Sequence, residues 1–225
     1  MDLTAAVAAL GRLHGAPADP PTGDPFELVL FENVAYLAPP ERRREAFEEL
    51  RRDVGTTPGA LLAARPGELE RVAARGILKG TSAEKLRECA RIAVEAFGGD
   101  VAAALDRDPA GARRALRRFP GIGEPGADKV LLFSGRAAVL APESNALRVL
   151  ARLGLIREEK SYAKTYAAAN AAASEALPRR ASALRRAHLL LQRHGQTVCR
   201  RTAPICGACP LRRGCAHARS ARRIG

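Results

Sequence analysis

Four cysteines near the end of the chain have the types and spacing that most clearly indicate chemistry. Cys199, Cys206, Cys209 and Cys215 are separated by six, two and five residues, so all four lie within 17 residues. Thiolates this close together can bind an iron–sulfur cluster without ligands from elsewhere in the chain. The segment therefore predicts a [4Fe–4S] cluster held by these four residues.

Zinc and disulfides are the alternatives for these cysteines. A four-cysteine zinc site usually has two C-x2-C pairs, and this segment has one, from Cys206 to Cys209. Disulfides are expected in secreted proteins, and the first ten residues lack the basic start of a secretory signal. The fifth cysteine, Cys89, lies in a helical pattern and is expected to be a small buried side chain.

A second motif is Phe119-Pro120-Gly121-Ile122-Gly123, which lies between two expected helices. Two glycines around one apolar residue allow a tight turn that brings backbone N–H groups against a phosphate oxygen. The following helix would add its positive N-terminal end, and Ile122 would pack back into the helix pair. Taken alone, the segment is also an ordinary loop.

The charge of the chain favours a nucleic-acid partner. Its 225 residues include 37 basic and 24 acidic ones, which gives a formal net charge of +13. Folding does not need this excess, whereas binding to phosphates would use it. The alternative is a solvated arginine-rich surface. No apolar stretch approaches the ~20 residues of a membrane span, so no membrane contact is expected.

The elements that must position these motifs are helices, and the predicted fold class is all-α. Alanine is abundant, aromatic residues make up 4% of the chain, and no β-branched alternation lasts long enough for a strand. Ser82 and Ser144 are expected to cap helix starts. Helices are expected over residues 3–13, 25–34, 41–54, 58–64, 67–74, 82–97, 100–106, 109–118, 126–133, 144–153, 162–177 and 181–193.

Together the cysteines and the hairpin resemble the endonuclease III group of helix-hairpin-helix DNA glycosylases. The approach to the first cysteine, His194-Gly195-Gln196-Thr197-Val198-Cys199, agrees with it. The resemblance implies two lobes flanking a cleft for double-stranded DNA. The helical barrel lobe with the helix-hairpin-helix would span 25–135. The cluster lobe would combine 1–24 with 136–225, including the cluster loop 199–215, and its cluster would be structural and DNA-contacting.

The resemblance also implies which residues touch DNA. Gly121, Ile122 and Gly123 would bind the backbone rather than read the sequence. Arg212 and Arg213 lie between the last two cysteines, where a rigid cluster would present both guanidiniums to phosphate.

The catalytic lysine of the bifunctional members of this group is missing. That lysine stands two residues past the hairpin, and its amine forms an imine with the sugar that permits strand cleavage. Here the position holds Pro125, which suits a helix start. Lys129 lies one turn further, roughly 5.4 Å away, and is expected to be solvated or in contact with phosphate rather than to replace the nucleophile.

Two carboxylates match acids of the family. Glu143 stands where a V-D-T-H pattern has aspartate, and Glu32 falls where mismatch-specific adenine glycosylases carry an acid that protonates the base. Each has a structural alternative, because Glu143 can stabilise a helix start and Glu32 can pair with Arg43 or Arg44. Tyr36 would stack where a base has been extruded, or lie in the core.

The residues and the resemblance together predict a monofunctional DNA N-glycosylase of base excision repair. Glu32 and Glu143 would be its catalytic residues, and it would act as a monomer in the cytoplasm, at the bacterial nucleoid. The alternatives are a relative that has lost its chemistry and binds damaged DNA, and a weak abasic-site lyase that uses Lys129. The sequence does not identify the excised base.

Overall fold

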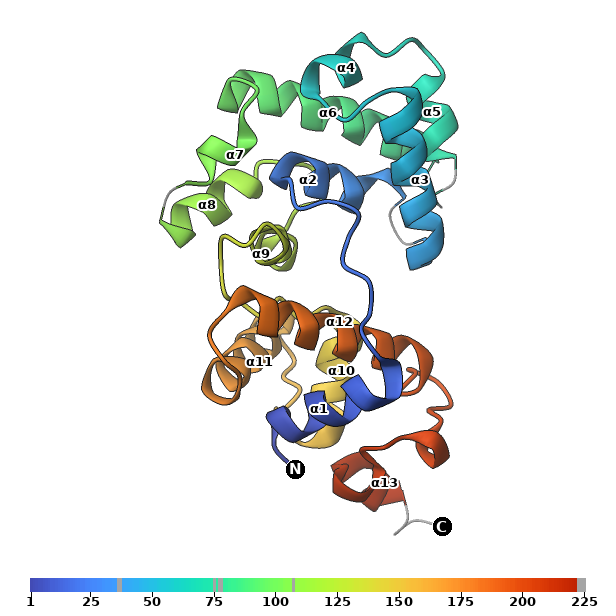
Figure 1. Ribbon diagram of the computed structural model, residues 1–225, viewed down its shortest axis with the longest axis vertical. Helices are drawn as coiled ribbons and strands as arrows, with labels where there is room; N and C mark the ends of the chain where they lie inside the picture. Colours follow the sequence, from blue (N-terminus) through green and yellow to red (C-terminus); the bar gives the residue numbers. More distant parts are fainter. Residues whose placement is uncertain (36–37, 75, 77–78, 107, 222–225) are drawn as a thin grey trace. The chain divides into compact units, whose positions relative to one another are not determined.

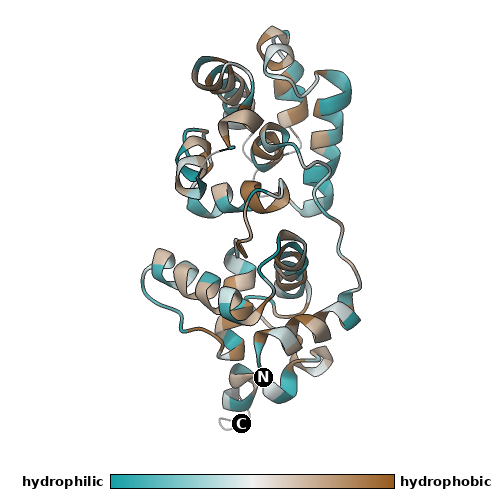
Figure 2. Ribbon diagram, turned by 60° about the vertical axis from the view of Figure 1, so that its left-hand side comes forward, coloured by the Kyte–Doolittle hydropathy of each residue, from teal (hydrophilic) through white to brown (hydrophobic). Residues whose placement is uncertain are grey.

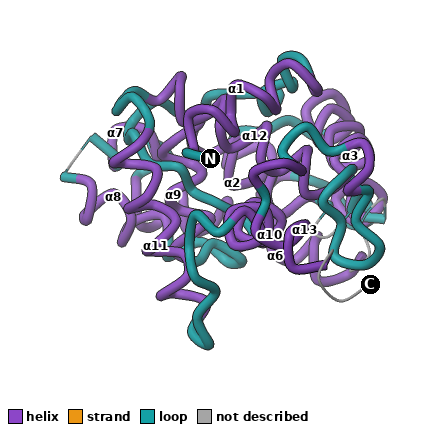
Figure 3. Tube along the Cα trace, turned by 90° about the horizontal axis from the view of Figure 1, so that it is seen from below, coloured by secondary structure: helices purple, strands orange, loops and turns teal. Residues whose placement is uncertain are grey.

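The computed structural model confirms the all-α fold class. Its described residues form helices and loops without a strand, as Figure 3 shows. Hydrophobic and hydrophilic residues alternate along most of the helices (Figure 2), so these helices can bury one side and expose another. Among the described helices, none is both long and apolar enough to cross a membrane. The described residues are 1–35, 38–74, 76, 79–106 and 108–221.

The chain divides into two compact units. The middle unit is Pro20–Ala137, and the terminal unit combines Met1–Asp19 with Ala138–Gly225. The lobes expected from the sequence divide the chain at slightly different places, after residues 24 and 135.

Helix α2 (Pro25–Val34) lies at the centre of the middle unit, packed against α3, α6, α7 and α9 (Figure 1). Eight of its ten residues are buried, and the other two are Glu27 and Glu32. A helix that is apolar on nearly all sides belongs inside a core. The remaining helices of the unit are α3 (Pro40–Asp53), α4 (Pro58–Ala63), α5 (Glu68–Ala73), α6 (Lys79–Phe97), α7 (Val101–Ala104), α8 (Pro109–Leu116) and α9 (Glu124–Phe133).

Glu27 joins the start of α2 to the end of α3. Its carboxylate accepts hydrogen bonds from Thr22 Oγ1 at 2.5 Å, Thr56 Oγ1 at 2.6 Å and Arg51 Nη2 at 3.2 Å. Burial by itself would raise the pKa of Glu27, but the three hydrogen bonds and the charge of Arg51 together lower it. The folded chain therefore holds this residue as a carboxylate.

In the terminal unit, α12 packs against both α1 and α10, and α10 also packs against α11 and α13. The segment between α12 and α13 has only two short 3-10 helices, so other elements must hold it in place. The bounds are α1 (Leu3–His14), α10 (Ser144–Leu153), α11 (Tyr162–Ala176), α12 (Ala181–Thr197), η1 (Cys206–Ala208), η2 (Arg212–Gly214) and α13 (Ala216–Ala221).

Two of the expected helix caps are wrong. Ser82 does not begin a helix, because α6 begins at Lys79 and Ser82 is buried within it. Ser144 is the first residue of α10, whose N-cap is Glu143. The longer acidic side chain of Glu143 accepts a hydrogen bond from the N–H of Ala146 in the first turn, which is the role expected of the serine hydroxyl.

The pH dependence of stability tests the role of Glu27. A carboxylate with a lowered pKa stabilises the fold above its ordinary value of 4.5, and this contribution is lost as the pH falls through the lowered value. We expect Glu27→Gln to reduce the free energy of unfolding by about 1–3 kcal/mol at neutral pH. The difference in the free energy of unfolding between this variant and the unchanged protein should become smaller in acid. Chemical denaturation at a series of pH values from neutral to acid measures it.

Glu48→Gln is the matched control, because Glu48 pairs with the same Arg51 but is 45% exposed. An exposed pair of this kind contributes at most about 1 kcal/mol. If the loss of unfolding free energy in Glu27→Gln were the same at neutral and acid pH, it would contradict the role assigned to the charge of Glu27.

Candidate functional site

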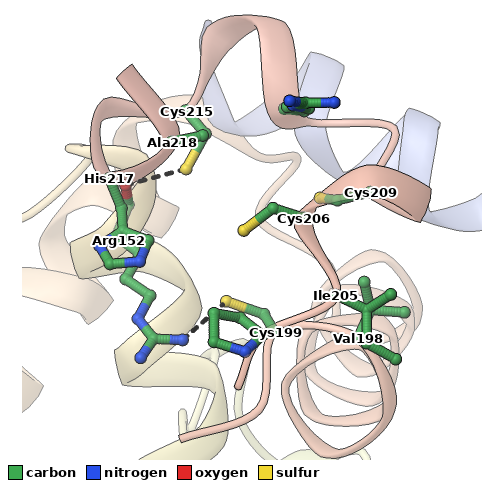
Figure 4. A pocket seen from close by; sticks show the side chains of 11 residues that line it. Arg152, Val198, Cys199, Ile205, Cys206, Cys209, Cys215, His217 and Ala218 are labelled. Carbon is green, nitrogen blue, oxygen red and sulfur yellow. Dashed lines mark hydrogen bonds between the residues drawn. The ribbon is translucent and has the colours of Figure 1, made fainter. Parts of the chain in front are cut away.

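The four clustered cysteines line a single pocket in the terminal unit (Figure 4). Cys199 follows α12, Cys206 begins η1, Cys209 follows η1, and Cys215 precedes α13. All are free thiols, and Figure 4 shows those of Cys199, Cys206 and Cys215 turned toward a shared space. Within the described part of the chain, no three His, Cys, Asp or Glu side chains form a group that could hold a metal ion.

Neighbouring side chains contact the thiols from two sides. Arg152 Nη1 lies 3.5 Å from Cys199 Sγ, and the Arg152 carbonyl accepts a hydrogen bond from Cys215 at 3.2 Å. His194 Nε2 lies 3.5 Å from Cys209 Sγ. Burial raises the pKa of the Cys209 thiol, and the charges of the other three cysteines raise it further. A cation bound here would have to displace that proton.

Glu143 is connected by side-chain hydrogen bonds to the segment that carries the four cysteines, residues 199–215, here called the cysteine segment. Arg148 donates to the carbonyls of Cys199 at 3.0 Å and Gly195 at 2.8 Å, and to Asn145 Oδ1 at 2.7 Å. Asn145 Nδ2 then donates to Glu143 Oε2 at 2.7 Å, while Oε1 accepts from a backbone N–H of the first turn of α10 at 2.8 Å. Both carboxylate oxygens therefore have donors, which fixes the side chain at the start of α10.

The network depends on a close approach of α12 to α10 at Gly195. A Cβ at this position would lie 2.7 Å from both the Cβ and the carbonyl oxygen of Asn145. Real Cβ atoms do not come this close to a backbone atom, so the space is available only to glycine. This approach brings the Gly195 carbonyl within reach of Arg148.

Sequence reasoning missed the residues that support the cysteines: Arg148, Arg152 and the two histidines described below. A signal for the arginines was present, because residues four apart lie on one face of a helix. His194 belongs to the motif that precedes Cys199, but its contact with His14 gave no signal, because the two histidines lie 180 residues apart.

The hairpin of the middle unit has the backbone form that the sequence predicts. Gly121 has a φ of 74°, which favours glycine, and a Cβ there would lie 2.8 Å from Asn33 Oδ1. Ile122 is buried and faces Gly126 of α9. Within the described residues, the N–H groups of Gly121 and Gly123 donate to no backbone carbonyl. Together with the N-terminus of α9, they can bind an anion.

Glu32, the second acid on α2, lies between two cations. Lys129 Nζ is 2.7 Å from its Oε1 and Arg43 Nη1 is 3.7 Å from the same atom, and all three side chains are at most 20% exposed. Lys129 is expected to be solvated or in contact with phosphate; it is not solvated, because its ammonium pairs with the half-buried carboxylate of Glu32, and its contact with phosphate stays a prediction. The pairing of Glu32 with Arg43 agrees with the structural alternative for this acid.

The candidate residues are shared between the two units. Glu32, Lys129 and the hairpin belong to the middle unit, whereas Glu143 and the cysteines belong to the terminal unit. Arg212 and Arg213 are exposed on η2. Pro125 is the second residue of α9. Tyr36 lies outside the described residues.

Comparison with known proteins identifies relatives over most of the chain. It is 25% identical over 192 residues to endonuclease III of Thermotoga maritima, a match that covers 85% of this chain and 83% of the relative. It is 26% identical over 134 residues to a protein of Methanocaldococcus jannaschii with the provisional name of a DNA repair glycosylase, covering 59% of each. No protein-family model matches the chain.

Solved structures share the fold. A trapped covalent intermediate of endonuclease III with DNA superposes with a TM-score of 0.79 at 19% identity, and a non-covalent endonuclease III–DNA complex with 0.78 at 18%. Each match covers 98% of this chain and 97% of the other. A thermostable thymine-DNA glycosylase follows with 0.77 at 18% identity, covering 97% of both chains. At these identities the likeness establishes the fold.

A methyl group at Gly195 tests the contact between α10 and α12. We expect Gly195→Ala to separate the two helices and to lower the free energy of unfolding by about 1–3 kcal/mol, the usual cost of overpacking. Gly207→Ala is the matched control in the cysteine segment, because a Cβ there meets nothing within 4 Å. Denaturant titration measures the free energy of unfolding of both variants. Equal values would show that α12 can shift without loss of stability.

Proposed function

We propose that this chain, an endonuclease III-like member of the helix-hairpin-helix DNA glycosylase superfamily, is a DNA N-glycosylase that removes a base and leaves the strand intact. The names of its relatives support a role in DNA repair. The observation that carries the finer proposal is Pro125 in the first turn of α9, which has no amine to form an imine with the sugar. Lys129, further along α9, is held by Glu32.

The proposed DNA contacts are made by backbone N–H groups in the middle unit and by exposed arginine side chains in the terminal unit. In the middle unit, the N–H groups of Gly121 and Gly123 would bind a phosphate oxygen, helped by the positive end of α9. In the terminal unit, Arg212 and Arg213 would contact phosphate from η2. Both contacts are independent of base sequence, so they would position the duplex rather than select a site.

In the proposed reaction, the glycosidic bond of an extruded nucleotide breaks and its electron pair leaves with the base. The Lys129 ammonium, 2.7 Å from the Glu32 carboxylate, gives it a proton, and Glu32 passes that proton to the leaving base. Glu143, held by Asn145 and the α10 backbone, stabilises the positive charge that develops on the sugar. Water adds to the sugar carbon and gives up one of its two protons, and the return of a proton to Lys129 through solvent completes the hydrolysis.

The four cysteines suit a [4Fe–4S] cluster in chemistry and number, because they are free thiols that line one pocket, and binding would draw them into the metal-holding group that the described residues do not form. When bound, the cluster would supply a rigid core between α12 and α13 rather than a chemical step. Arg148 and Arg152 would hold the segment around it, through the carbonyls of Cys199, Arg200 and Arg201. Zinc bound by the same cysteines is the alternative.

A DNA-binding protein without chemistry is the second candidate. The observation that favours it is that both proposed catalytic acids have structural partners, Glu32 in an ion pair with Lys129 and Glu143 at a helix cap. In this function the hairpin and the arginines of η2 would act as described, and the two acids would contribute to stability alone.

Excision from a panel of lesion-containing duplexes separates these functions. We expect strand breaks only after treatment with alkali, because a glycosylase without an imine leaves an intact abasic strand. In single turnover, Glu32→Gln should slow excision by roughly 10²–10⁴-fold through loss of a proton donor. Glu143→Gln should slow it by roughly 10²–10³-fold through loss of a stabilising charge.

Both variants should keep their DNA affinity, since neither acid is assigned to phosphate. Unchanged rates in folded variants would remove the two residues from the mechanism. Strand breaks without alkali would establish a lyase, and no excision from any duplex would favour the binding protein.

The salt dependence of DNA affinity tests the backbone contacts. With about five phosphate contacts, log affinity should fall against log salt with a slope near −4.5. Arg212→Ala should reduce the slope by about one unit and affect all sequences equally. The control is Arg65→Ala, because Arg65 is 84% exposed but already paired with Glu68. Equal slopes for the two variants would show that η2 does not touch the duplex.

A further inference from the structure

Two histidines from distant parts of the sequence form a chain that ends at a cysteine of the pocket. His14 is the last residue of α1, and its Nε2 lies 3.2 Å from Nδ1 of His194 in the last turn of α12. On the other side of the His194 ring, Nε2 lies 3.5 Å from Cys209 Sγ. The rings meet edge to face with centroids 5.4 Å apart, and His194 is 1% exposed. Both ring nitrogens of a buried imidazole therefore have a partner.

Binding of the cysteine to iron determines the direction of these hydrogen bonds. A thiolate can only accept, so Nε2 of His194 must carry the hydrogen that points to Cys209. A neutral imidazole has one donor and one acceptor, so Nδ1 of His194 must accept, and Nε2 of His14 must donate to it. The order of donation is His14 to His194 to Cys209.

His194 is placed by its backbone as well as by its ring. Its carbonyl oxygen accepts hydrogen bonds from the N–H groups of Val198 at 2.9 Å and Cys199 at 2.8 Å. The residue therefore lies in the last turn of α12, just before the first cysteine, and its ring contacts the third cysteine, Cys209. Through His14, helix α1 becomes part of the surroundings of the pocket.

We propose that the His14–His194–Cys209 relay raises the reduction potential of the cluster. The inference rests on the cluster of the proposed function. A hydrogen bond to a ligating sulfur stabilises the more negative, reduced state, and hydrogen bonds to the sulfurs are among the main determinants of cluster potentials. Donation from His14 polarises the His194 ring and strengthens its bond to the sulfur, an effect that is larger in a buried site.

Measurement of the potential in variants of His14 tests the relay. In the loaded protein, a redox titration followed by electron paramagnetic resonance gives the potential of the one-electron couple of the cluster. We expect His14→Leu to lower the reduction potential by up to about 59 mV. This corresponds to a tenfold change in the equilibrium constant for one-electron reduction of the cluster. His14→Gln should restore most of the shift, because its amide can donate to Nδ1 of His194.

Two further variants separate the relay from a general loosening of α1. Leu13→Ala changes the neighbouring side chain, which is 44% exposed, and should leave the potential unchanged. His194→Leu has neither an acceptor for His14 nor a donor to Cys209, so it removes the route from His14 to the sulfur. With this substitution present, adding His14→Leu should cause no further shift, so the double-mutant cycle isolates the coupling.

The outcomes distinguish failure of the relay from failure of the cluster. A chain that binds no iron after anaerobic preparation overturns both. A chain with about four irons and the same potential in His14→Leu as in the unchanged protein overturns the relay alone. The nitrogen-15 shifts of the unchanged protein give a result that needs no variant. A His194 ring that carries its hydrogen on Nδ1 would contradict the proposed direction of donation.

Discussion

Charge removed from water must be paired, and this constraint organises both units of the chain. Helix α2 has almost no exposed side, so Glu27 requires Arg51 and Glu32 requires Lys129. In the terminal unit, burial lowers the pKa of Arg148, yet its guanidinium meets the carbonyls that end α12 and the side chain of Asn145. Each pairing joins elements that apolar packing alone would leave free to slide, because contacts between apolar side chains have no preferred direction.

The same pairings place the groups proposed to act on DNA. The bond from Lys129 to Glu32 ties α9, and with it the hairpin, to the central helix of the middle unit. Arg113 of α8 pairs with the buried Asp128 of α9, so the two helices around the hairpin are joined by a second ion pair. A phosphate-binding turn needs a rigid backbone, since its N–H groups must keep their geometry without a ligand. The same contacts therefore contribute to stability and to the proposed binding of phosphate.

The sequence predicted elements better than it predicted contacts. Helix periodicity and proline positions located most helices, because these signals depend on residues close together in the chain. The caps failed at Ser82 and Ser144, where tertiary packing and the longer side chain of Glu143 outweighed the local preference for a hydroxyl. Glycine spacing predicted the turn at Gly121, since a φ of 74° is a local property. The partner of Lys129 could not be found in this way, because Glu32 lies on another helix.

The cysteine pocket shows this limit most clearly. The four cysteines proposed as ligands lie close together in the sequence, but the groups that contact them, directly or through His194, come from α1, α10 and α12. Arg148 and Arg152 share a helix face, whereas His14 reaches the pocket only because α1 packs on α12. A short loop with four thiols has little core of its own, so longer helices must fix its backbone and supply its hydrogen bonds. The properties of a bound cluster would then also depend on residues outside the four cysteines, because the spacing of the cysteines concerns the metal ligands alone and the fold supplies the groups that contact those ligands.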